Sequence, residues 1–337
     1  MNNLYHLTTS PPVLPGSDAM VQEVDLLRAR FGGQVVWLRP SWRARARYPR
    51  ALLGFHRLLA IRRQDARVDL HHVYAPQLDW MPLLSLVKRP VVYTVATGLD
   101  PGRRLPPLAF LRRLAAIVVP SETDRAALAR RGLARVHVIR PGIDVGRFAD
   151  SPAPSGPGFA LLSGSAPWTA EQFQTKGVDL LLEAAREMPD VRLVFLWRGV
   201  LLPELLARVQ KLGLSDRVEI LHDWVDVSRV MAGVHAAAVL TGRRGLVKAY
   251  PHSLLEALAA GRPVFVSRGD PMAAYVEETG CGRVLARLDR AELVAAIGAL
   301  RQGYERYRAR AAEVGQRDFS QEEFVAAHRR LYRTLVG

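Results

Sequence analysis

The chain has 337 residues, 49% hydrophobic and 23% charged, with a formal net charge of +15; these values exclude a wholly disordered chain, and the length favours two domains. No apolar run approaches the roughly 18 residues of a membrane-spanning helix, Met1 to Ser10 lack the pattern of a secretory signal, and the single cysteine, Cys281, excludes a disulfide framework or a multi-thiolate zinc site. We therefore expect a cytoplasmic, metal-independent protein of two domains.

In the first half of the chain, short apolar runs alternate with amphipathic stretches. The expected strands are Gln34–Leu38, Leu70–Tyr74, Val91–Val95, Ala116–Val119 and Val136–Ile139. The expected helices are Asp18–Arg30, Pro49–Arg63, Leu105–Leu114 and Glu122–Arg131. The adjacent His71 and His72 have no nearby carboxylate or cysteine in the sequence, so we expect them to pack rather than to bind a metal.

The second half repeats this alternation. The expected strands are Phe159–Leu162, Arg192–Leu196, Val218–Leu221, Ala236–Leu240 and Val264–Ser267. The expected helices are Val178–Glu187, Leu202–Leu212, Val227–Ala232, Ser253–Ala260, Pro271–Glu278, Ala291–Arg310 and Ser320–Leu335. Because strands separated by helices form parallel sheets covered on both faces, we predict an α/β chain with two Rossmann-like domains. Ligands of such sheets bind beyond the carboxyl ends of the strands, here toward an interdomain cleft.

A segment rich in proline, serine and glycine marks the expected domain boundary. It runs from Ser151 to Gly158 and lies near the middle of the chain. We predict an acceptor-side domain over residues 1–150, a linker over 151–157 and a donor-binding domain over 158–319. A final helix over 320–337 is expected to pack back on the first domain.

Three segments carry more specific information than the general fold pattern. They are Val118-Val119-Pro120-Ser121-Glu122 with Val138-Ile139-Arg140-Pro141-Gly142-Ile143-Asp144 and Phe148; Lys176-Gly177-Val178-Asp179-Leu180-Leu181-Leu182-Glu183-Ala184; and Tyr250-Pro251-His252-Ser253-Leu254-Leu255-Glu256-Ala257-Leu258-Ala259-Ala260-Gly261-Arg262-Pro263-Val264. The order and spacing of these segments resemble those of glycosyltransferase family 4, whose members are retaining enzymes of the GT-B architecture. The resemblance covers residues 115–285 well and the first hundred residues loosely.

The third segment reads as the start of a helix that faces an anion. Pro251 suits a first helical turn and Ser253 can help to cap it. The first backbone N–H groups, near His252 and Ser253, and the positive end of the helix dipole then suit a diphosphate. Glu256 lies one turn further on, and the resemblance implies that its carboxylate binds the ribose; a solvated carboxylate is the alternative.

Lys176 is the second candidate. The chain has four lysines against 43 arginines, so a lysine before Gly177 at a loop-to-helix junction is informative about the required side-chain shape. A compact ammonium there can approach phosphate oxygens as a point charge. The resemblance implies that this lysine binds the donor diphosphate, and an exposed lysine without a role is the alternative.

The sequence also departs from the family at three places. Ser165 stands where the family usually has an arginine, and Arg243 or Arg244 can supply the missing phosphate contact unless they form a solvated turn. Lys248 replaces the first of two glutamates, and we predict that it assists the diphosphate, with selection of an acidic sugar or a solvent-facing lysine as alternatives. The stretch Val92–Gly98 lacks the histidine that contacts the donor sugar in many members.

Other candidates for the donor site come from loops. Gly16 and Ser17, before the first expected helix, stand where the family has a glycine-rich turn that approaches the donor or acceptor; an ordinary turn with an N-cap is the alternative. Arg198 and Trp224 follow strands and can line a nucleobase pocket, although Trp224 can equally pack between domains.

The net positive charge is concentrated in the first half. Residues 1–150 hold 23 Lys and Arg against 11 Asp and Glu, whereas residues 151–337 hold 24 against 21. The excess suggests an anionic partner, or simply an arginine-rich composition. A basic segment with aromatic residues resembles a patch for anionic lipid, and a solvated loop is the alternative; its residues are Trp42, Arg43, Arg45, Arg47 and Arg50.

Together these features predict a hexosyltransferase-type enzyme of the cell envelope. It would transfer a sugar from a nucleotide-diphosphate donor to a hydroxyl acceptor, which can be a glycan, lipid-linked or small, with retention of configuration. Lys176, Glu256 and Lys248 are the expected catalytic residues; no metal or other cofactor is expected. A noncatalytic sugar-nucleotide or glycan-binding homologue is the alternative, and nucleic-acid binding lacks a recognisable module. We expect a cytoplasmic protein, peripheral on the inner face of the membrane.

Overall fold

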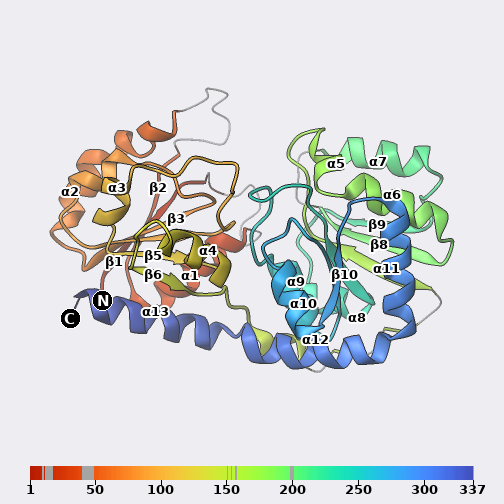
Figure 1. Ribbon diagram of the computed structural model, residues 1–337. Coiled ribbons are helices and arrows are strands. Elements are labelled where there is room, and N and C mark those ends of the chain that lie inside the picture. Colours follow the sequence, from red (N-terminus) through yellow and green to blue (C-terminus); the bar gives the residue numbers. More distant parts are fainter. Residues whose placement is uncertain are drawn as a thin grey trace. The chain divides into compact units, whose positions relative to one another are not determined.

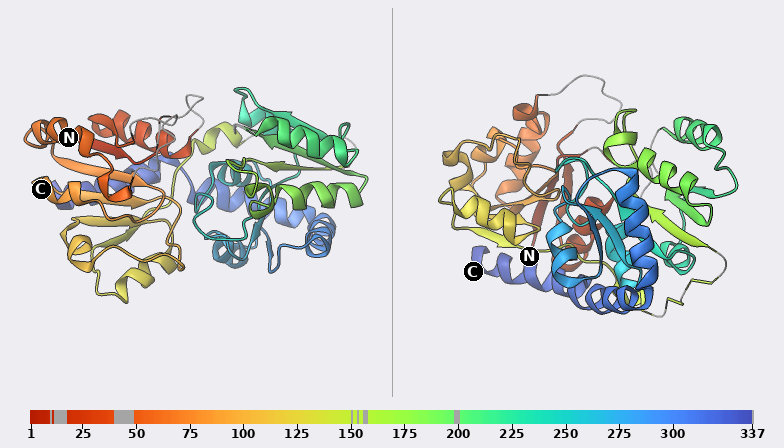
Figure 2. Two further views of the ribbon diagram at one scale, coloured as in Figure 1. Left: turned by 90° about the horizontal axis from the view of Figure 1, so that it is seen from above. Right: turned by 45° about the vertical axis from the view of Figure 1, so that its right-hand side comes forward.

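A computed structural model describes residues 1–9, 11, 18–39, 49–149, 151–152, 154–155, 158–197 and 201–336, of which Arg50 is described only by its backbone. The chain forms two compact units (Figure 1). Unit 1 comprises Met1–Gly142 and Glu322–Gly337, and unit 2 comprises Ile143–Gln321. Each unit contains one six-stranded parallel sheet with helices on both faces (Figures 1 and 2), as the sequence predicts.

In unit 1 the strand order is β2-β1-β3-β4-β5-β6. The strands are β1 (Asn3–Leu7), β2 (Gln34–Trp37), β3 (Leu70–Ala75), β4 (Val91–Val95), β5 (Ala116–Val119) and β6 (Val136–Val138). The helices are α1 (Ala19–Phe31), η1 (Arg50–Leu52), η2 (Phe55–Arg57), α2 (Leu58–Asp65), η3 (Pro82–Leu86), α3 (Leu108–Arg113), α4 (Glu122–Ala129) and the C-terminal α13 (Gln321–Val336).

Alternation of side chains along the strands of unit 1 produces two cores. One face packs Tyr5 and Tyr74 with apolar residues of α1 and α13, whereas the other packs Val73 and Tyr93 with residues of α2, η3, α3 and α4. Successive strand residues point to opposite faces, so each strand needs apolar residues at almost every position. The C-terminal helix therefore completes a core formed mainly by the first half of the chain, as predicted.

In unit 2 the strand order is β12-β11-β10-β7-β8-β9. The strands are β7 (Phe159–Ser163), β8 (Val191–Leu196), β9 (Val218–Leu221), β10 (Ala236–Val239), β11 (Val264–Ser267) and β12 (Gly282–Leu285). The helices are η4 (Val145–Phe148), α5 (Gln172–Thr175), α6 (Val178–Glu187), α7 (Leu202–Lys211), α8 (Val227–Ala232), α9 (His252–Ala259), α10 (Ala273–Thr279), α11 (Arg290–Gln302) and α12 (Tyr304–Asp318).

Two cores also cover the second sheet. Apolar residues of α8, α9, α10 and α12 pack on one face, and those of α6, α7 and α11 pack on the other. The amphipathic helices α6 and α7 show why: their buried residues are apolar and recur at helical spacing, for example Leu181, Leu182 and Ala185 in α6.

Several expected boundaries differ from the structure. Strands β1 and β12 were not predicted, the helix expected over Ala291–Arg310 is interrupted at Gly303, and the helix expected over Pro49–Arg63 is two short 3-10 turns followed by α2. The two units divide between Gly142 and Ile143, ahead of the predicted linker. Ile143 and Phe148 are buried in the core of unit 2, which explains the earlier division.

A buried polar network crosses the sheet of unit 1. Asp65 accepts a hydrogen bond from His71 Nε2 at 2.9 Å, and His71 Nδ1 lies 2.9 Å from His6 Nε2. Because a carboxylate only accepts, His71 carries its proton on Nε2 and accepts from His6 through Nδ1. His72 lies 2.5 Å from Tyr332 of α13 and 2.7 Å from Thr94, so His72 of β3 joins α13 to the sheet.

Candidate active site

The candidate site lies at the carboxyl ends of β7 and β10, the two strands at which the order of the second sheet reverses. β7 is the first strand of unit 2, and the chain continues from it to β8 and β9 on one side and to β10, β11 and β12 on the other. At such a switch point the connections leave in opposite directions, which exposes the strand ends to a ligand. The site is built from residues of unit 2.

A glycine brings the end of β7 against the start of α9. A methyl group at Gly164 would lie 2.8 Å from both Cβ and Oγ of Ser253, so only glycine allows this approach. Pro251 is the N-cap of α9, and its carbonyl accepts the first intrahelical bond, from the amide of Leu254 at 2.9 Å. The first-turn amides of a helix have no intrahelical acceptor, so this end attracts anions. The helix begins at His252, one residue before the predicted start.

A second close approach places Lys176 at the same strand ends. Gly177 adopts a left-handed conformation, with φ of 69°, and a methyl group there would lie 2.6 Å from Cβ of Leu240 at the end of β10. The amide of Gly242 also donates to the carbonyl of Thr175 at 2.9 Å. These contacts fix the residue between them, Lys176, at the switch point.

The side chain of Lys176 is almost fully buried. It is 5% exposed, and its Nζ donates to the carbonyl of Ala166, in the loop after β7, at 2.9 Å. Burial lowers the pKa of Lys176 to about 8, because the charged ammonium loses hydration when it is buried. Among the described residues the neutral carbonyl of Ala166 is the one hydrogen-bond acceptor of the ammonium, so none of them balances its charge, which favours an anion beside it.

The loop after β10 is held by the ends of two neighbouring strands. The amide of Thr241 donates to Ser267 Oγ at 2.9 Å, and that hydroxyl donates to the carbonyl of Thr241 at 2.7 Å. Thr241 Oγ1 donates in turn to the carbonyl of Arg243 at 2.8 Å. The turn that carries Arg243 is therefore ordered by side-chain hydrogen bonds, although the Arg243 side chain itself is exposed.

Asp270 is a further buried ionisable side chain near this loop. Burial raises the pKa of its carboxyl to about 7, although the amide of Met272 and the positive charge of Arg244 oppose the shift. Sequence reasoning missed Asp270, Thr241 and Ser267. Their only sequence signal is a polar residue at or just after the end of each expected strand.

The other predicted residues are placed as follows. Ser165, Arg244, Lys248, His252, Ser253 and Glu256 are half-buried, and Glu256 lies one turn into α9. Trp224 follows β9, two strands away from β7 on the same edge of the sheet, and is 70% exposed. The structure therefore gathers Ser165, Lys176, Arg243 and Ser253 around two strand ends and leaves Trp224 at the periphery.

Some predicted residues lie outside the described part of the chain. They are Gly16, Ser17, Arg198, Trp42, Arg43, Arg45 and Arg47, together with the side chain of Arg50. Asp18, directly after Ser17, is described: its carboxylate caps α1 by accepting from the amides of Met20 at 2.8 Å and Val21 at 3.2 Å. Asp18 is therefore the N-cap of α1.

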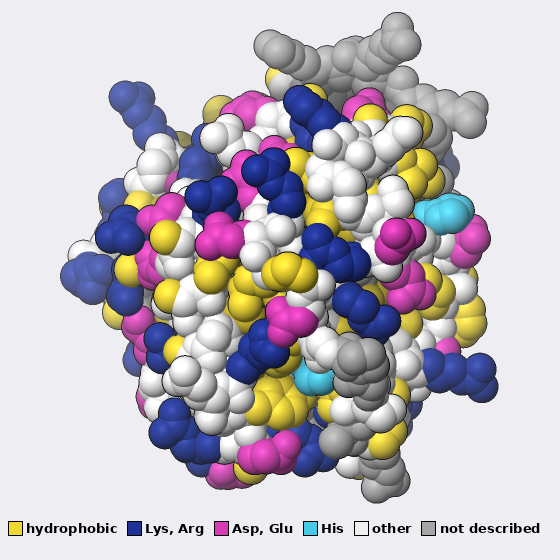
Figure 3. Space-filling model, turned by 90° about the vertical axis from the view of Figure 1, so that its right-hand side faces the viewer, with side chains coloured by type: hydrophobic (Ala, Val, Ile, Leu, Met, Phe, Trp, Pro, Cys, Tyr) yellow, Lys and Arg dark blue, Asp and Glu magenta, His cyan; other side chains and the backbone are white. Residues whose placement is uncertain are grey.

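Three general properties of the described residues complete the site's description. They contain no group of three or more His, Cys, Asp or Glu side chains able to hold a metal ion. Within the same residues no helix is long and apolar enough to cross a membrane. On the face of unit 2 drawn in Figure 3, acidic and basic side chains are interspersed, in line with the nearly balanced charge of the second half.

The geometry defines a class of protein before any comparison. Two doubly wound parallel-sheet units, one with a helix N-terminus and a buried lysine at its switch point, are typical of enzymes that bind phosphorylated nucleotides. Comparison with known families agrees. A model described as glycosyl transferases group 1 matches residues 170–317, and a model described as Glycosyltransferase Family 4 matches residues 16–147. The two matches together span most of the chain, which belongs to the GT-B glycosyltransferases of the family 4 type.

Solved structures show the same fold at low sequence identity. The UDP complex of HepE from Anabaena superposes with a TM-score of 0.73 at 15% identity, covering 99% of this chain and 100% of that one. WaaG, a glycosyltransferase involved in lipopolysaccharide biosynthesis, gives 0.70 at 15% identity over 99% and 100%. Sucrose-phosphate synthase from Thermosynechococcus elongatus gives 0.70 at 16% identity over 99% of each chain. A sequence search of curated proteins returns no match.

Proposed function

We propose that this glycosyltransferase moves a hexose from a nucleotide-diphosphate donor to a hydroxyl acceptor. One observation carries the proposal: the nearly buried ammonium of Lys176 lies at the switch point of unit 2, beside the strand end that Gly164 packs against the start of α9. A diphosphate bound there would meet the ammonium and the helix amides together. That HepE was solved with UDP and with UDP-glucose supports a nucleotide-sugar donor for this fold.

The same groups would stabilise the transition state. As the glycosidic bond to the donor breaks, negative charge grows on the leaving diphosphate, and fixed cations and amides aimed at it lower the barrier. We assign this role to Lys176, the amides at the start of α9, and Lys248, with Arg243 or Arg244 as a further contact. Glu256, one turn into α9, would accept hydrogen bonds from the ribose hydroxyls. A metal ion is not needed for this charge stabilisation.

The stereochemistry and the acceptor belong to the proposal as well. Retention follows from the family resemblance, with the leaving phosphate taking the acceptor's proton on the same face of the sugar. A lipid-linked acceptor in cell-envelope glycan synthesis would suit the basic first half of the chain, because residues 1–150 contain 23 Lys and Arg but only 11 Asp and Glu. We place the protein in the cytoplasm, on the inner face of the membrane.

A ligand screen followed by a turnover assay tests the proposal. The chain is heated with UDP-, GDP- and ADP-sugars, and the correct donor, at 100 times its dissociation constant, should add about 2.7 kcal/mol of stability. That donor should then be hydrolysed slowly without an acceptor. With an acceptor it should be consumed faster, and its sugar should be transferred to the acceptor. NMR of the transferred sugar's anomeric proton reports retention.

Two results would contradict the proposal in different ways. If no nucleotide sugar stabilises the chain, the donor assignment fails. If a nucleotide sugar binds but neither hydrolysis nor transfer occurs, the noncatalytic binding homologue is the better description, with Ser165 and Lys248 as marks of lost activity.

A further inference from the structure

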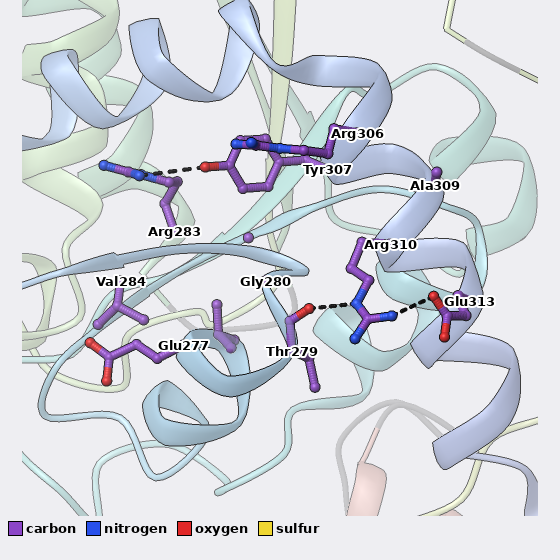
Figure 4. Close-up of a pocket in the computed structure, with 12 residues that line it drawn as sticks. Glu277, Thr279, Gly280, Arg283, Val284, Arg306, Tyr307, Ala309, Arg310 and Glu313 are labelled. Atoms are coloured by element: carbon purple, nitrogen blue, oxygen red, sulfur yellow. Dashed lines mark hydrogen bonds and ion pairs between the residues drawn. The ribbon is translucent and has the colours of Figure 1, made fainter.

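A groove of about 730 Å³ lies in unit 2 at the opposite end of the sheet from the candidate active site. It is formed by the last turn of α10, the first residues of β12 and one face of α12 (Figure 4). The amino end of β12, at Gly282 and Arg283, borders it, whereas Lys176 lies at the carboxyl ends of β7 and β10. The groove is therefore separate from the donor site described above.

Three arginines border the groove, and two of them have no acidic partner in the part of the chain that the structure describes. Arg310 is held by Glu313 at 2.6 Å and by the carbonyl of Thr279 at 2.7 Å. For Arg283 and Arg306, no carboxylate of the described residues lies within ion-pair distance; both instead contact Tyr307. This leaves two unneutralised positive charges in one groove.

The acidic side chains of the groove do not cancel these charges. Glu277 forms an ion pair with Arg268 at 2.7 Å, and Glu313 contacts both Arg310 and Arg317. Each carboxylate is thus already matched by an arginine other than Arg283 and Arg306. The uncompensated charge of the groove is positive.

Tyr307 adds a neutral donor between the two arginines. Arg283 Nη1 donates to the Tyr307 hydroxyl at 3.4 Å, and the Arg306 guanidinium carbon lies 5.1 Å from the centre of the ring. The hydroxyl proton of Tyr307 has no acceptor among the described residues, and both guanidiniums lie beside the ring in Figure 4. The cluster therefore offers O–H and N–H donors without a competing acceptor, which is the chemistry that an oxyanion requires.

We propose that Arg283, Arg306 and Tyr307 form a second ligand site, for the phosphate dianion of a phosphorylated sugar or a similar small phosphate monoester. The two guanidiniums balance its double charge. The groove is much larger than a phosphate, and Val284 and Ala309 also border it, so it has room for the organic part of the molecule. Inorganic phosphate shares the recognised group and is the second probe.

Calorimetric titration of the full chain, saturated with the nucleoside diphosphate of the donor that stabilises it most, tests this site with glucose 6-phosphate, inorganic phosphate and glucose as probes. We expect glucose 6-phosphate to bind more tightly than phosphate, and glucose not to bind. Arg283→Gln and Arg306→Gln should each weaken glucose 6-phosphate about fivefold, and the double variant by more than tenfold. Tyr307→Phe, which keeps the ring, should weaken it about threefold.

Two control variants separate this site from other sources of binding. Arg186→Gln removes an exposed arginine of α6, which does not border the groove, and should leave binding unchanged. Lys176→Met should also leave it unchanged, and a loss there would mean that phosphate occupies the donor site and would overturn the proposal. The proposal would also be overturned if the wild type and the Arg283→Gln/Arg306→Gln variant bound glucose 6-phosphate equally well with unchanged melting temperatures. It would be overturned as well if inorganic phosphate bound as tightly as glucose 6-phosphate, or if neither bound.

Discussion

The two units bury ionisable side chains in different places and with different partners. In unit 1, His6, His71 and His72 lie in the middle of the sheet and are joined by hydrogen bonds to Asp65, Thr94 and Tyr332. In unit 2, the buried Lys176 and Asp270 lie beyond the strands, at their carboxyl ends. The histidines of unit 1 hydrogen-bond to other side chains, although His6 Nδ1 has no partner among the described residues. Among the same residues, the side chains of Lys176 and Asp270 each hydrogen-bond to a single backbone group.

This contrast separates structural from functional polarity. A buried polar group with protein partners stabilises one conformation. Removing a partner lowers the free energy of unfolding by the desolvation penalty of the group that is left buried without a hydrogen bond. A buried charge with an incomplete set of partners destabilises the ligand-free protein and is compensated when a ligand arrives. We therefore expect substitutions in the histidine network to change folding, and substitutions at the strand ends of unit 2 to change donor handling.

Acidification should produce the largest effect, and it should act on unit 1. Burial lowers the pKa of His6, His71 and His72, and it lowers the pKa of His328 to about 4. Below pH 6.5 these histidines bind protons in the unfolded chain but not in the folded one, so the free energy of unfolding falls as the pH drops from about 6.5 toward 4. For His328 alone this loss is about 3 kcal/mol.

Hydrogen exchange, measured in pulses after incubation at each pH, should show that β3 and α13 open before the strands of unit 2. His328→Leu should make the acid dependence shallower, whereas His222→Gln, at an exposed position of unit 2, should not. Simultaneous opening of both units at every pH would contradict a histidine network that stabilises unit 1 alone.

Removing the acceptor at the end of the network should have the next largest effect. Asp65 accepts from His71 and from the amides of Lys88 and Arg89, so Asp65→Ala should lower the free energy of unfolding by about 3 kcal/mol. Asp25→Ala, at an exposed helix position, should cost less than about 0.5 kcal/mol. Donor affinity should be unchanged in both; a loss of affinity in Asp65→Ala, measured well below its melting temperature, would weaken the separation between the units.

Substitutions of Lys248 test whether the strand ends of unit 2 act on the donor rather than on folding. If it assists the diphosphate, Lys248→Ala should lower kcat/KM by about 10- to 150-fold with little change in melting temperature. Lys248→Glu should lower it further, because a carboxylate repels phosphate. If Lys248→Glu instead raises activity toward a neutral donor sugar, the lysine is a lesion in a decayed site and the noncatalytic alternative gains.

The smallest predicted effect is an alkaline limb in the pH profile. Because burial lowers the pKa of Lys176 to about 8, its ammonium is lost above that pH, and kcat/KM for the donor should fall about tenfold per pH unit. The Lys176→Arg variant stays charged and should lose this limb even if it is slower. A wild-type profile that is flat from pH 7 to 10 would contradict a role for the Lys176 charge.

Most of the fold could be predicted from the sequence, because short apolar runs alternate with amphipathic helices, a pattern that is typical of parallel sheets. The sequence did not reveal β1, whose residues Asn3 and His6 are polar. These side chains are buried in the structure and hydrogen-bond to Tyr5 and His71, which are partners that local propensity cannot supply. The structure also divides the helix expected over 291–310 at Gly303. This division could not be predicted, because an isolated glycine occurs both at helix ends and inside helices.

The candidate site was predictable where a local motif carried it. Lys176 and the start of α9 lie in the motifs quoted from the sequence, and the structure brings them to neighbouring strand ends through Gly164 and Gly177. Asp270 and the groove at Arg283 were not predictable. Their properties come from burial and from which charges are already paired, and both depend on segments far apart in the chain.

The most direct test of the central claim compares nucleoside diphosphates with monophosphates. Calorimetry would measure the affinity of the preferred nucleotide in the wild type, in Lys176→Met and in Lys211→Met, which removes an exposed lysine of α7. If Lys176 faces the diphosphate, Lys176→Met weakens the diphosphate about tenfold or more and the monophosphate much less, whereas Lys211→Met changes neither. Unchanged diphosphate affinity in Lys176→Met, or an equal loss for both nucleotides, would contradict the claim.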